Sequence, residues 1–433
     1  MNADIRNMKT PAEQALSAAF VDARGRLPGL AELRARAFES FEARGLPHRR
    51  VEEWKYTDLR SLLREFAPLA GTPNAAAKAT AEAAGRILAG VETRRLVFVD
   101  GAFVPELSDL APERGLSVTS MAEALAKGDP LVMQHVGKVF ATDDVAVALN
   151  TALMGDGVVI HVAAEAQIGR PLHLVFAGGE TPASAFVRSL VVVEQGARVT
   201  LIEEHDSGAL QVNAALELVA ADHSQVDYFK ITQVRALHVA SLLASIGADA
   251  RFNSFAFTRN SPLVRNQTFI RFAGERTEAG IRGVGLLKGK EHVDTTLLIE
   301  HAKGHCGSRE QFKTVLDDES HGVFQGKIVV QPHAQKTDAK MLTRALLLSE
   351  EAEADNKPEL EIFADDVQCG HGATAGALDR TLKFYLMSRG ISEAEAEALL
   401  VQAFIGETVE EIAHEGIREA LMNAAIEWLQ ERR

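Results

Sequence analysis

A long series of short β-type runs, between about residues 157 and 331, constrains the fold of this chain most strongly. Runs rich in Val, Ile, Phe and Thr recur roughly every 12 to 15 residues, with glycine or charged turns between them. The clearest runs are 158–162, 172–176, 189–193, 199–202, 226–231, 252–257, 264–272, 292–299 and 322–324. No helical stretch of about 10 residues separates them, so the pattern argues against a βαβ fold and predicts an all-β solenoid or sandwich.

Alternation within single runs favours the solenoid. Val264, Ile270 and Phe272 are apolar, whereas Arg265 and Arg271 fall on the opposite side of the same run. Such a run has one face turned inward. A β-sandwich is the alternative, but clear long-range hairpin signals are missing from the series. The sequence therefore favours a right-handed parallel β-helix as the core.

Composition changes divide the chain into three parts. Residues 1–93 are rich in Ala, Leu and charged residues and read as a helical domain. The β-helix core is expected over 94–376, with a helical insertion at about 121–148 and an early hairpin that turns at Asp100-Gly101. Residues 377–433 form a helical tail.

The tail carries apolar helix faces and two predicted capping boxes, Ser392 with Glu395 and Thr408 with Glu411. The apolar residues singled out for partner docking are Leu382, Tyr385, Leu386, Leu399, Leu400 and Phe404. Two interpretations are compatible: a cap that seals the open end of the solenoid, or a docking module for another protein.

Charge and composition exclude several classes of protein. The 433 residues include 60 acidic and 46 basic side chains, a formal net charge of −14 that disfavours binding to nucleic acid or to an anionic membrane. Neither a signal peptide nor a run of about 18 apolar residues is recognisable, so we expect a cytoplasmic protein with no membrane partner. Two cysteines are too few for a disulfide framework and suit a reducing compartment.

Cys369 and His371 form a candidate metal-ligand pair. Thiolate and imidazole are ligands that iron and zinc prefer. Residues i and i+2 of an extended segment point to the same side, with their Cα atoms about 7 Å apart, so Cys369 and His371 could approach one ion or cluster. Cys306, the other cysteine, is distant in sequence. Iron–sulfur clusters usually need about four protein ligands, so two cysteines imply either other ligand types or a site shared with a partner.

Other motifs are weaker. Five histidines, His292, His301, His305, His321 and His333, gather near the end of the β region and read mostly as coil-lining or turn residues. The glycine-rich segment 283–291 lacks the spacing of a phosphate-binding loop.

The acidic pairs Asp317-Asp318 and Asp365-Asp366 leave open a carboxylate-dependent polysaccharide hydrolase or lyase. Aromatic residues for sugar stacking are sparse, however, at 6% of the chain. The absence of a self-sufficient catalytic set favours a scaffold or binding protein.

Several segments together resemble the SufB/SufD family of iron–sulfur cluster assembly proteins. The matching segments are 53–58 (EWKYTD), 334–339 (AQKTDA), 346–353 (LLLSEEAE), 357–362 (KPELEI), 364–367 (ADDV), 369–374 (CGHGAT) and 388–391 (SRGI). Gly372 stands where the SufB type has glutamate, so the chain resembles the SufD type. Gly370 and Ala377 depart from the usual serine and glutamine of that type.

The resemblance implies a right-handed parallel β-helix between two helical domains. It implies a SufB-like partner, a SufC-like ABC-type ATPase docked on the C-terminal helices, and no catalysis by this chain itself. A transient iron–sulfur cluster would form at the interface with the SufB-like subunit, with His371 as a candidate ligand and Cys369 beside it. No cofactor would be held by the chain alone. A purely structural homodimer is a further alternative.

Overall fold

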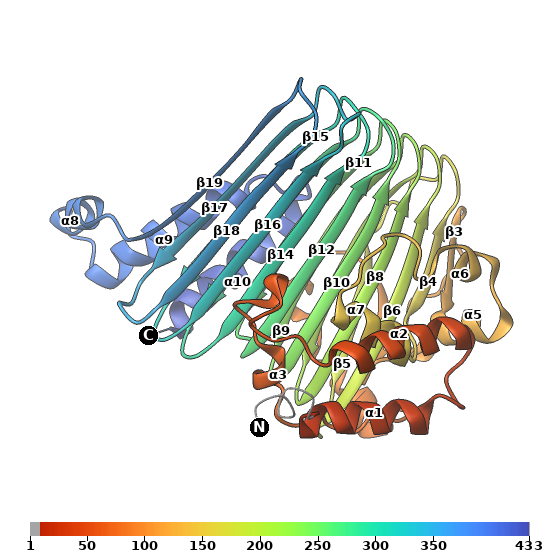
Figure 1. The fold of residues 1–433 in the computed structure, drawn as a ribbon. Coiled ribbons are helices and arrows are strands. Elements are labelled where there is room, and N and C mark those ends of the chain that lie inside the picture. Colours follow the sequence, from red (N-terminus) through yellow and green to blue (C-terminus); the bar gives the residue numbers. More distant parts are fainter. Residues whose placement is uncertain (1–8, 433) are drawn as a thin grey trace, which may run out of the picture.

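The computed structural model describes residues 9–432 and consists mainly of two β-sheets (Figure 1). Beyond the first few strands, successive strands alternate between the two sheets, and each strand pairs in parallel with those two positions before and after it. Each turn of the coil thus adds one strand to either sheet. The predicted parallel β-helix is confirmed, and the sandwich alternative is wrong because, from β4 (Val158–Val162) to β19 (Gln368–Ala377), the strands pair with one another in parallel and never with a sequence neighbour.

The ten-stranded sheet holds mostly odd-numbered strands and is called the odd sheet. Its members are β1 (Arg94–Val99), β2 (Ala102–Phe103), β5 (Leu172–Gly178), β7 (Arg198–Ser207), β9 (Gln225–Val234), β11 (Arg251–Arg259), β13 (Glu278–Leu287), β15 (Gly307–Leu316), β17 (Asp338–Leu347) and β19 (Gln368–Ala377). β1 and β2 form the predicted hairpin, with positive φ at Asp100 and Gly101.

The nine-stranded sheet, called the even sheet, faces the odd sheet across the core. Its members are β3 (Leu116–Ser120), β4 (Val158–Val162), β6 (Ala183–Val193), β8 (Leu210–Ala220), β10 (Leu237–Ile246), β12 (Leu263–Phe272), β14 (His292–His301), β16 (His321–Val330) and β18 (Glu353–Ile362). Alternation in β12 follows the prediction: Val264, Ile270 and Phe272 are fully buried, while Arg265 points to the outer face.

Helices from the N-terminal part cover the outer face of the even sheet (Figure 1). These are α1 (Pro11–Ala23), α2 (Ala31–Arg44), α3 (Leu59–Leu62) and, from the stretch between β3 and β4, α5 (Met121–Lys127), α6 (Pro130–His135) and α7 (Val145–Leu153). Leu16, Phe41 and Leu149 of this layer pack against Phe186 and Val239 of the sheet. α4 (Ala75–Thr80) instead contacts β1 and β5 of the odd sheet.

Trp54 is the anchor of this N-terminal layer. It lies in a short 3-10 helix, Glu52–Trp54, and is 1% exposed. The Arg265 guanidinium stacks on its ring at 3.8 Å, and its indole N–H donates to Asp144 at 2.9 Å. The aromatic-plus-charge segment 53–58 therefore joins the helical layer to the β-helix.

The C-terminal helices lie on the outer face of the odd sheet. α9 (Glu393–Val409) and α10 (Glu415–Glu431) bury Val401, Ile405 and Trp428 in one apolar cluster that also contains Phe229 and Phe257 of the sheet. The interpretation of the tail as a cap on the open end of the solenoid is therefore wrong. The odd strands present outward apolar residues, among them Ile231, Val284 and Val315, and burial of these residues holds the helices on this face.

One of the two predicted capping boxes is also wrong. Ser392 caps α9 and accepts a hydrogen bond from the Glu395 backbone N–H, as predicted. Thr408 lies inside α9 and is fully buried, and α10 starts instead after His414, whose ring caps it. Packing of the surrounding apolar face on the odd sheet outweighs the local capping preference.

The last turn of the coil is uncovered. β18 and β19 end the even and odd sheets, contact each other, and consist almost entirely of partly buried or exposed residues. Within the part of the chain that the structure describes, each therefore has one hydrogen-bonding edge without a strand partner. Among residues 9–432, no helix has the length and apolar content needed to cross a bilayer.

Candidate functional site

Cys369 and His371 both lie on β19, the last strand of the odd sheet. Cys369 pairs in register with Ala339 of β17 and His371 pairs with Met341. Ala339 and Met341 are buried in the core between the two sheets. Paired residues of parallel strands point to the same side, so Cys369 and His371 face this inner side, where the coil ends and the core opens to solvent.

The two side chains differ in exposure. Cys369 is half-buried against the inner core, whereas His371 is exposed. Burial raises the pKa of the Cys369 thiol, and the nearby carboxylates of Asp338 and Glu310 raise it further. Cys369 is therefore a thiol at neutral pH unless a metal displaces its proton. His371 is the more accessible ligand.

Glu310 of β15 is a buried carboxyl group close to this site. It pairs in register with Met341, which in turn pairs with His371, so the three residues form one column on the inner side. Glu310 is 2% exposed, and burial raises its pKa to about 7. Glu310 was not singled out in the sequence, because the inward direction of its side chain depends on the register of β15.

Cys306 does not join Cys369. It is buried in the turn before β15, and its thiol donates to the carbonyl oxygens of Gly274 and Gly304 at 3.3 and 3.4 Å. Burial also raises its pKa. The two cysteines thus have separate environments, and Cys306 behaves as a core residue.

The histidines of the β region separate into distinct groups. His301 is fully buried at the end of β14, its Nε2 lies 3.1 Å from the Ser308 hydroxyl, and burial lowers its pKa to about 3. His305 lies in a turn with positive φ, as expected for a turn residue. His292 and His321, by contrast, are adjacent on the outer face of the even sheet, 3.1 Å apart at Nδ1.

β19 does not supply a complete metal site. Within residues 9–432, the one group of three His, Cys, Asp or Glu side chains whose ligand atoms all lie within 4.8 Å of one another is His321, Glu353 and Asp355. Neither Cys369 nor His371 belongs to it. The strand offers two ligands on one exposed side, and a cluster there needs ligands from elsewhere.

The glycine-rich segment 283–291 has a packing role. Gly283 lies on β13, and a Cβ atom there would stand 2.6 Å from the ring of Phe312. Gly283 therefore leaves room for a buried aromatic side chain. This agrees with the failure of the segment to match a phosphate-binding loop.

The predicted docking residues lie at different depths. Leu382 and Tyr385 on α8 (Arg380–Ser388) are 51% and 53% exposed, and Leu399 of α9 is 42% exposed. Leu386 and Leu400 are partly buried. Phe404 is also partly buried, and packs under Lys313 of the odd sheet with Nζ 4.8 Å from its ring centroid.

Phe384 on α8 was not singled out in the sequence and is 73% exposed. α8 contacts α9, and Lys383 holds it there through ion pairs with Glu393 and Glu397. Figure 1 shows α8 projecting beyond the last strands of the coil. α8 thus presents an exposed apolar surface, made of Leu382, Phe384 and Tyr385.

Family models match almost the entire chain. The SufBD protein N-terminal region matches residues 19–174, and the SufBD core domain of the SUF iron–sulfur cluster assembly system matches residues 175–404. The chain therefore belongs to the SufB/SufD family of iron–sulfur cluster assembly proteins.

Individual relatives refine this assignment. The chain is 32% identical to the iron–sulfur cluster assembly protein SufD of Escherichia coli, over 87% of this chain and 88% of that protein. It is 31% identical to a SufBD family protein of Synechocystis over 85% and 84% of the two chains, and 27% identical to SufD of Bacillus subtilis over 73% and 75%. Within the family the chain is of the SufD type, and its role lies in iron–sulfur cluster assembly.

Proposed function

We propose that this chain is a non-catalytic scaffold subunit on which an iron–sulfur cluster is assembled together with a SufB-like partner. This proposal rests on the incomplete set of metal ligands on β19. His371 and Cys369 share one open side, and no third ligand completes a compact group with them in the described chain. The remaining ligands would come from the partner, and the cluster would leave with its recipient.

His371 has the central role in this proposal. Its exposed imidazole can ligate iron, or can carry a proton to or from sulfide while the cluster forms. Cys369 lies half-buried beside it with a raised pKa. We infer that Cys369 lines the site and becomes a ligand only when iron displaces its proton.

The uncovered strands β18 and β19 are the surface on which we place the partner. Exposed strand edges usually carry a covering element, since they otherwise promote uncontrolled pairing. A SufB-like β-helix laid against this end would pair with these edges and enclose His371. If a second copy of this chain occupied this end instead, the resulting complex would be the purely structural homodimer.

We place a SufC-like ATPase on the exposed apolar surface of α8. The chain has no phosphate-binding loop of its own, so nucleotide hydrolysis would be supplied by another subunit. α8 stands apart from the β-helix and contacts α9, so a movement of the ATPase would reach the coil through this pair of helices.

The polysaccharide hydrolase alternative gains no support from its carboxylates. Asp317 forms an ion pair with Arg432, Asp366 forms one with Lys336, and Asp318 accepts a hydrogen bond from the Gly289 backbone. These three side chains are engaged in contacts within the chain.

The test is anaerobic co-expression of the His371→Ala variant with its SufB-like and SufC-like partners. We expect the variant to associate normally and to accumulate iron and sulfide at less than about a tenth of the wild-type level. His333→Ala is the matched control, because His333 is also exposed but lies in the turn before β17. Normal cluster content in His371→Ala would remove His371 from the mechanism.

A further inference from the structure

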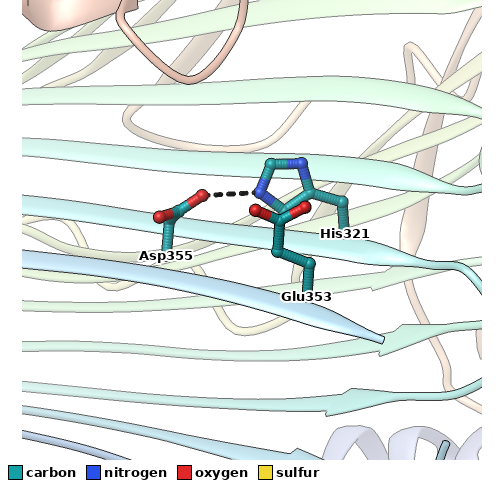
Figure 2. A group of neighbouring side chains, drawn as sticks. All are labelled: His321, Glu353 and Asp355. Carbon is teal, nitrogen blue, oxygen red and sulfur yellow. Dashed lines mark hydrogen bonds and ion pairs between the residues drawn. The ribbon is translucent and has the colours of Figure 1, made fainter. Parts of the chain in front are cut away.

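A second group of potential ligands lies on the outer face of the even sheet, away from the inner side on which His371 is placed. His292, His321 and Glu353 are the first residues of β14, β16 and β18, and they stand in register on successive turns. Asp355 follows two residues after Glu353 on the same side of β18. Figure 2 shows the side chains of His321, Glu353 and Asp355 converging.

The geometry of these three side chains fits one ion. One ligand atom from each of His321, Glu353 and Asp355 lies within 4.8 Å of the others. The His321 Nε2 atom is 2.8 Å from an Asp355 oxygen. Within the described chain no lysine or arginine forms an ion pair with Glu353, so two carboxylates converge on a single imidazole. Such a pair of like charges is stabilised by a cation.

A hydrogen bond at the Nδ1 atom of His321 fixes the orientation of its imidazole ring. The Thr57 hydroxyl donates to Asp294, so its oxygen accepts from the Nε2–H of His292 at 2.9 Å. With its proton on Nε2, His292 accepts at Nδ1 a hydrogen bond from the Nδ1–H of His321 at 3.1 Å. This leaves the Nε2 atom of His321 directed at Asp355. Metal-bound histidines are commonly held through their second ring nitrogen in this way.

Thr57 and Asp294, which support His292, lie beside Trp54, the anchor of the N-terminal layer. Thr57 lies three residues after Trp54, and Asp294 is held by a buried ion pair with Arg265, which also stacks on Trp54. Lys357, the nearest lysine on β18, is engaged by Glu52 and Glu359. The basic groups around the site therefore have other partners, and they do not neutralise Glu353.

We propose that His321, Glu353 and Asp355 form a binding site for a divalent first-row transition-metal ion. The ion takes the place of the proton shared by His321 Nε2 and Asp355, and this proton is released to solvent. One imidazole and two carboxylates suit Zn²⁺, Mn²⁺ or Fe²⁺, and the exposure of Glu353 leaves other coordination positions to water. The site is independent of the cluster role proposed for His371.

Equilibrium dialysis of the full chain against Zn²⁺, followed by metal analysis, tests this site. The background carries Cys369→Ser and His371→Ala, so that β19 contributes no ligands. We expect one bound Zn²⁺, with affinity at least ~10-fold weaker in Glu353→Gln and in Asp355→Asn. Glu361→Gln is the matched control, because Glu361 lies on the same face of β18 but pairs with Lys327.

A second readout follows from the position of the site between β16 and β18. Bound Zn²⁺ should raise the unfolding temperature of the background protein and of Glu361→Gln, and should have little effect on Glu353→Gln. Glu353 is exposed, so its substitution by glutamine leaves the fold intact. Absence of stoichiometric Zn²⁺ binding would overturn the proposal. Equal affinity of the background protein and Glu353→Gln would overturn it as well.

Discussion

At the residue scale, the neighbourhood of His371 depends on strand register. The choice of Cys369 and His371 came from residue type and i, i+2 spacing, and β19 has the extended form that this spacing requires. Glu310 could not be found in this way. It becomes a neighbour only because β15, β17 and β19 stack in register, and this register is set by the lengths of the intervening turns.

The raised pKa of Glu310 predicts a pH-dependent cost to stability. Its pKa rises from 4.5 to about 7 on folding, so the protonated form is favoured in the folded state. The contribution of Glu310 to stability is therefore greatest below pH 4.5, falls as the pH rises to about 7, and stays low above that value. The loss amounts to about 3 kcal/mol at most.

Glu310→Gln removes this dependence with little change in shape. Relative to wild type, the variant should gain about 3 kcal/mol in unfolding free energy between pH 4.5 and pH 8, measured by urea denaturation at both values. Glu361→Gln, on an exposed strand face, is the control. Parallel pH profiles for wild type and Glu310→Gln would show that Glu310 titrates normally.

At the element scale, the apolar runs of the sequence located nine of the core strands. β8, β10, β13, β15, β17, β18 and β19 had no predicted run of their own, and the helix boundaries of the tail were also less predictable. Thr408 and Glu411 have the sequence of a capping box, yet α9 continues through Thr408 because Ile405 and Val409 are buried on one apolar face. A local capping preference of about 1 kcal/mol is smaller than the burial of two such side chains. Only the tertiary contacts reveal which preference prevails.

The exposed surface of α8 predicts where an ATPase subunit docks. Leu382→Asp combined with Tyr385→Asp should lower co-purification of the SufC-like subunit at least ~10-fold, because both side chains would lose apolar contact in the complex. Met133→Asp is the control, since Met133 is 48% exposed on α6 of the opposite helical layer. These point substitutions are preferable to deletion of residues 377–433, which would uncover Phe229 and Phe257. Undiminished co-purification would place the ATPase elsewhere.

The buried position of Trp54 predicts that its replacement lowers the stability of the protein. Trp54→Ala should lower the free energy of unfolding by about 3 to 5 kcal/mol, since it removes a buried indole and leaves Arg265 without its stacking partner. Thermal unfolding monitored by circular dichroism measures this loss. Val51→Ala, at a nearby exposed apolar residue, should change stability by less than about 0.5 kcal/mol. Equal melting temperatures for wild type and Trp54→Ala would contradict the anchoring role.

At the scale of the whole molecule, the layered arrangement was only partly predictable. The sequence indicates a coil flanked by helices, but an apolar helix face does not reveal which surface receives it. The odd strands contained a signal for this, because β9 carries Phe229 and Ile231 outward as well as Val226 and Tyr228 inward. Strands that are apolar on both sides are typically covered on both sides. This leaves the end formed by β18 and β19 as the uncovered part of the coil.

The most direct measurement is the iron and sulfide content of the chain purified anaerobically, alone and in complex with its SufB-like and SufC-like partners. The proposed shared site predicts that iron and sulfide accumulate together in the complex, while the isolated chain holds less than about one tenth as much sulfide. An isolated chain with the same iron and sulfide content as the complex would contradict it, since β19 would then not need ligands from a partner.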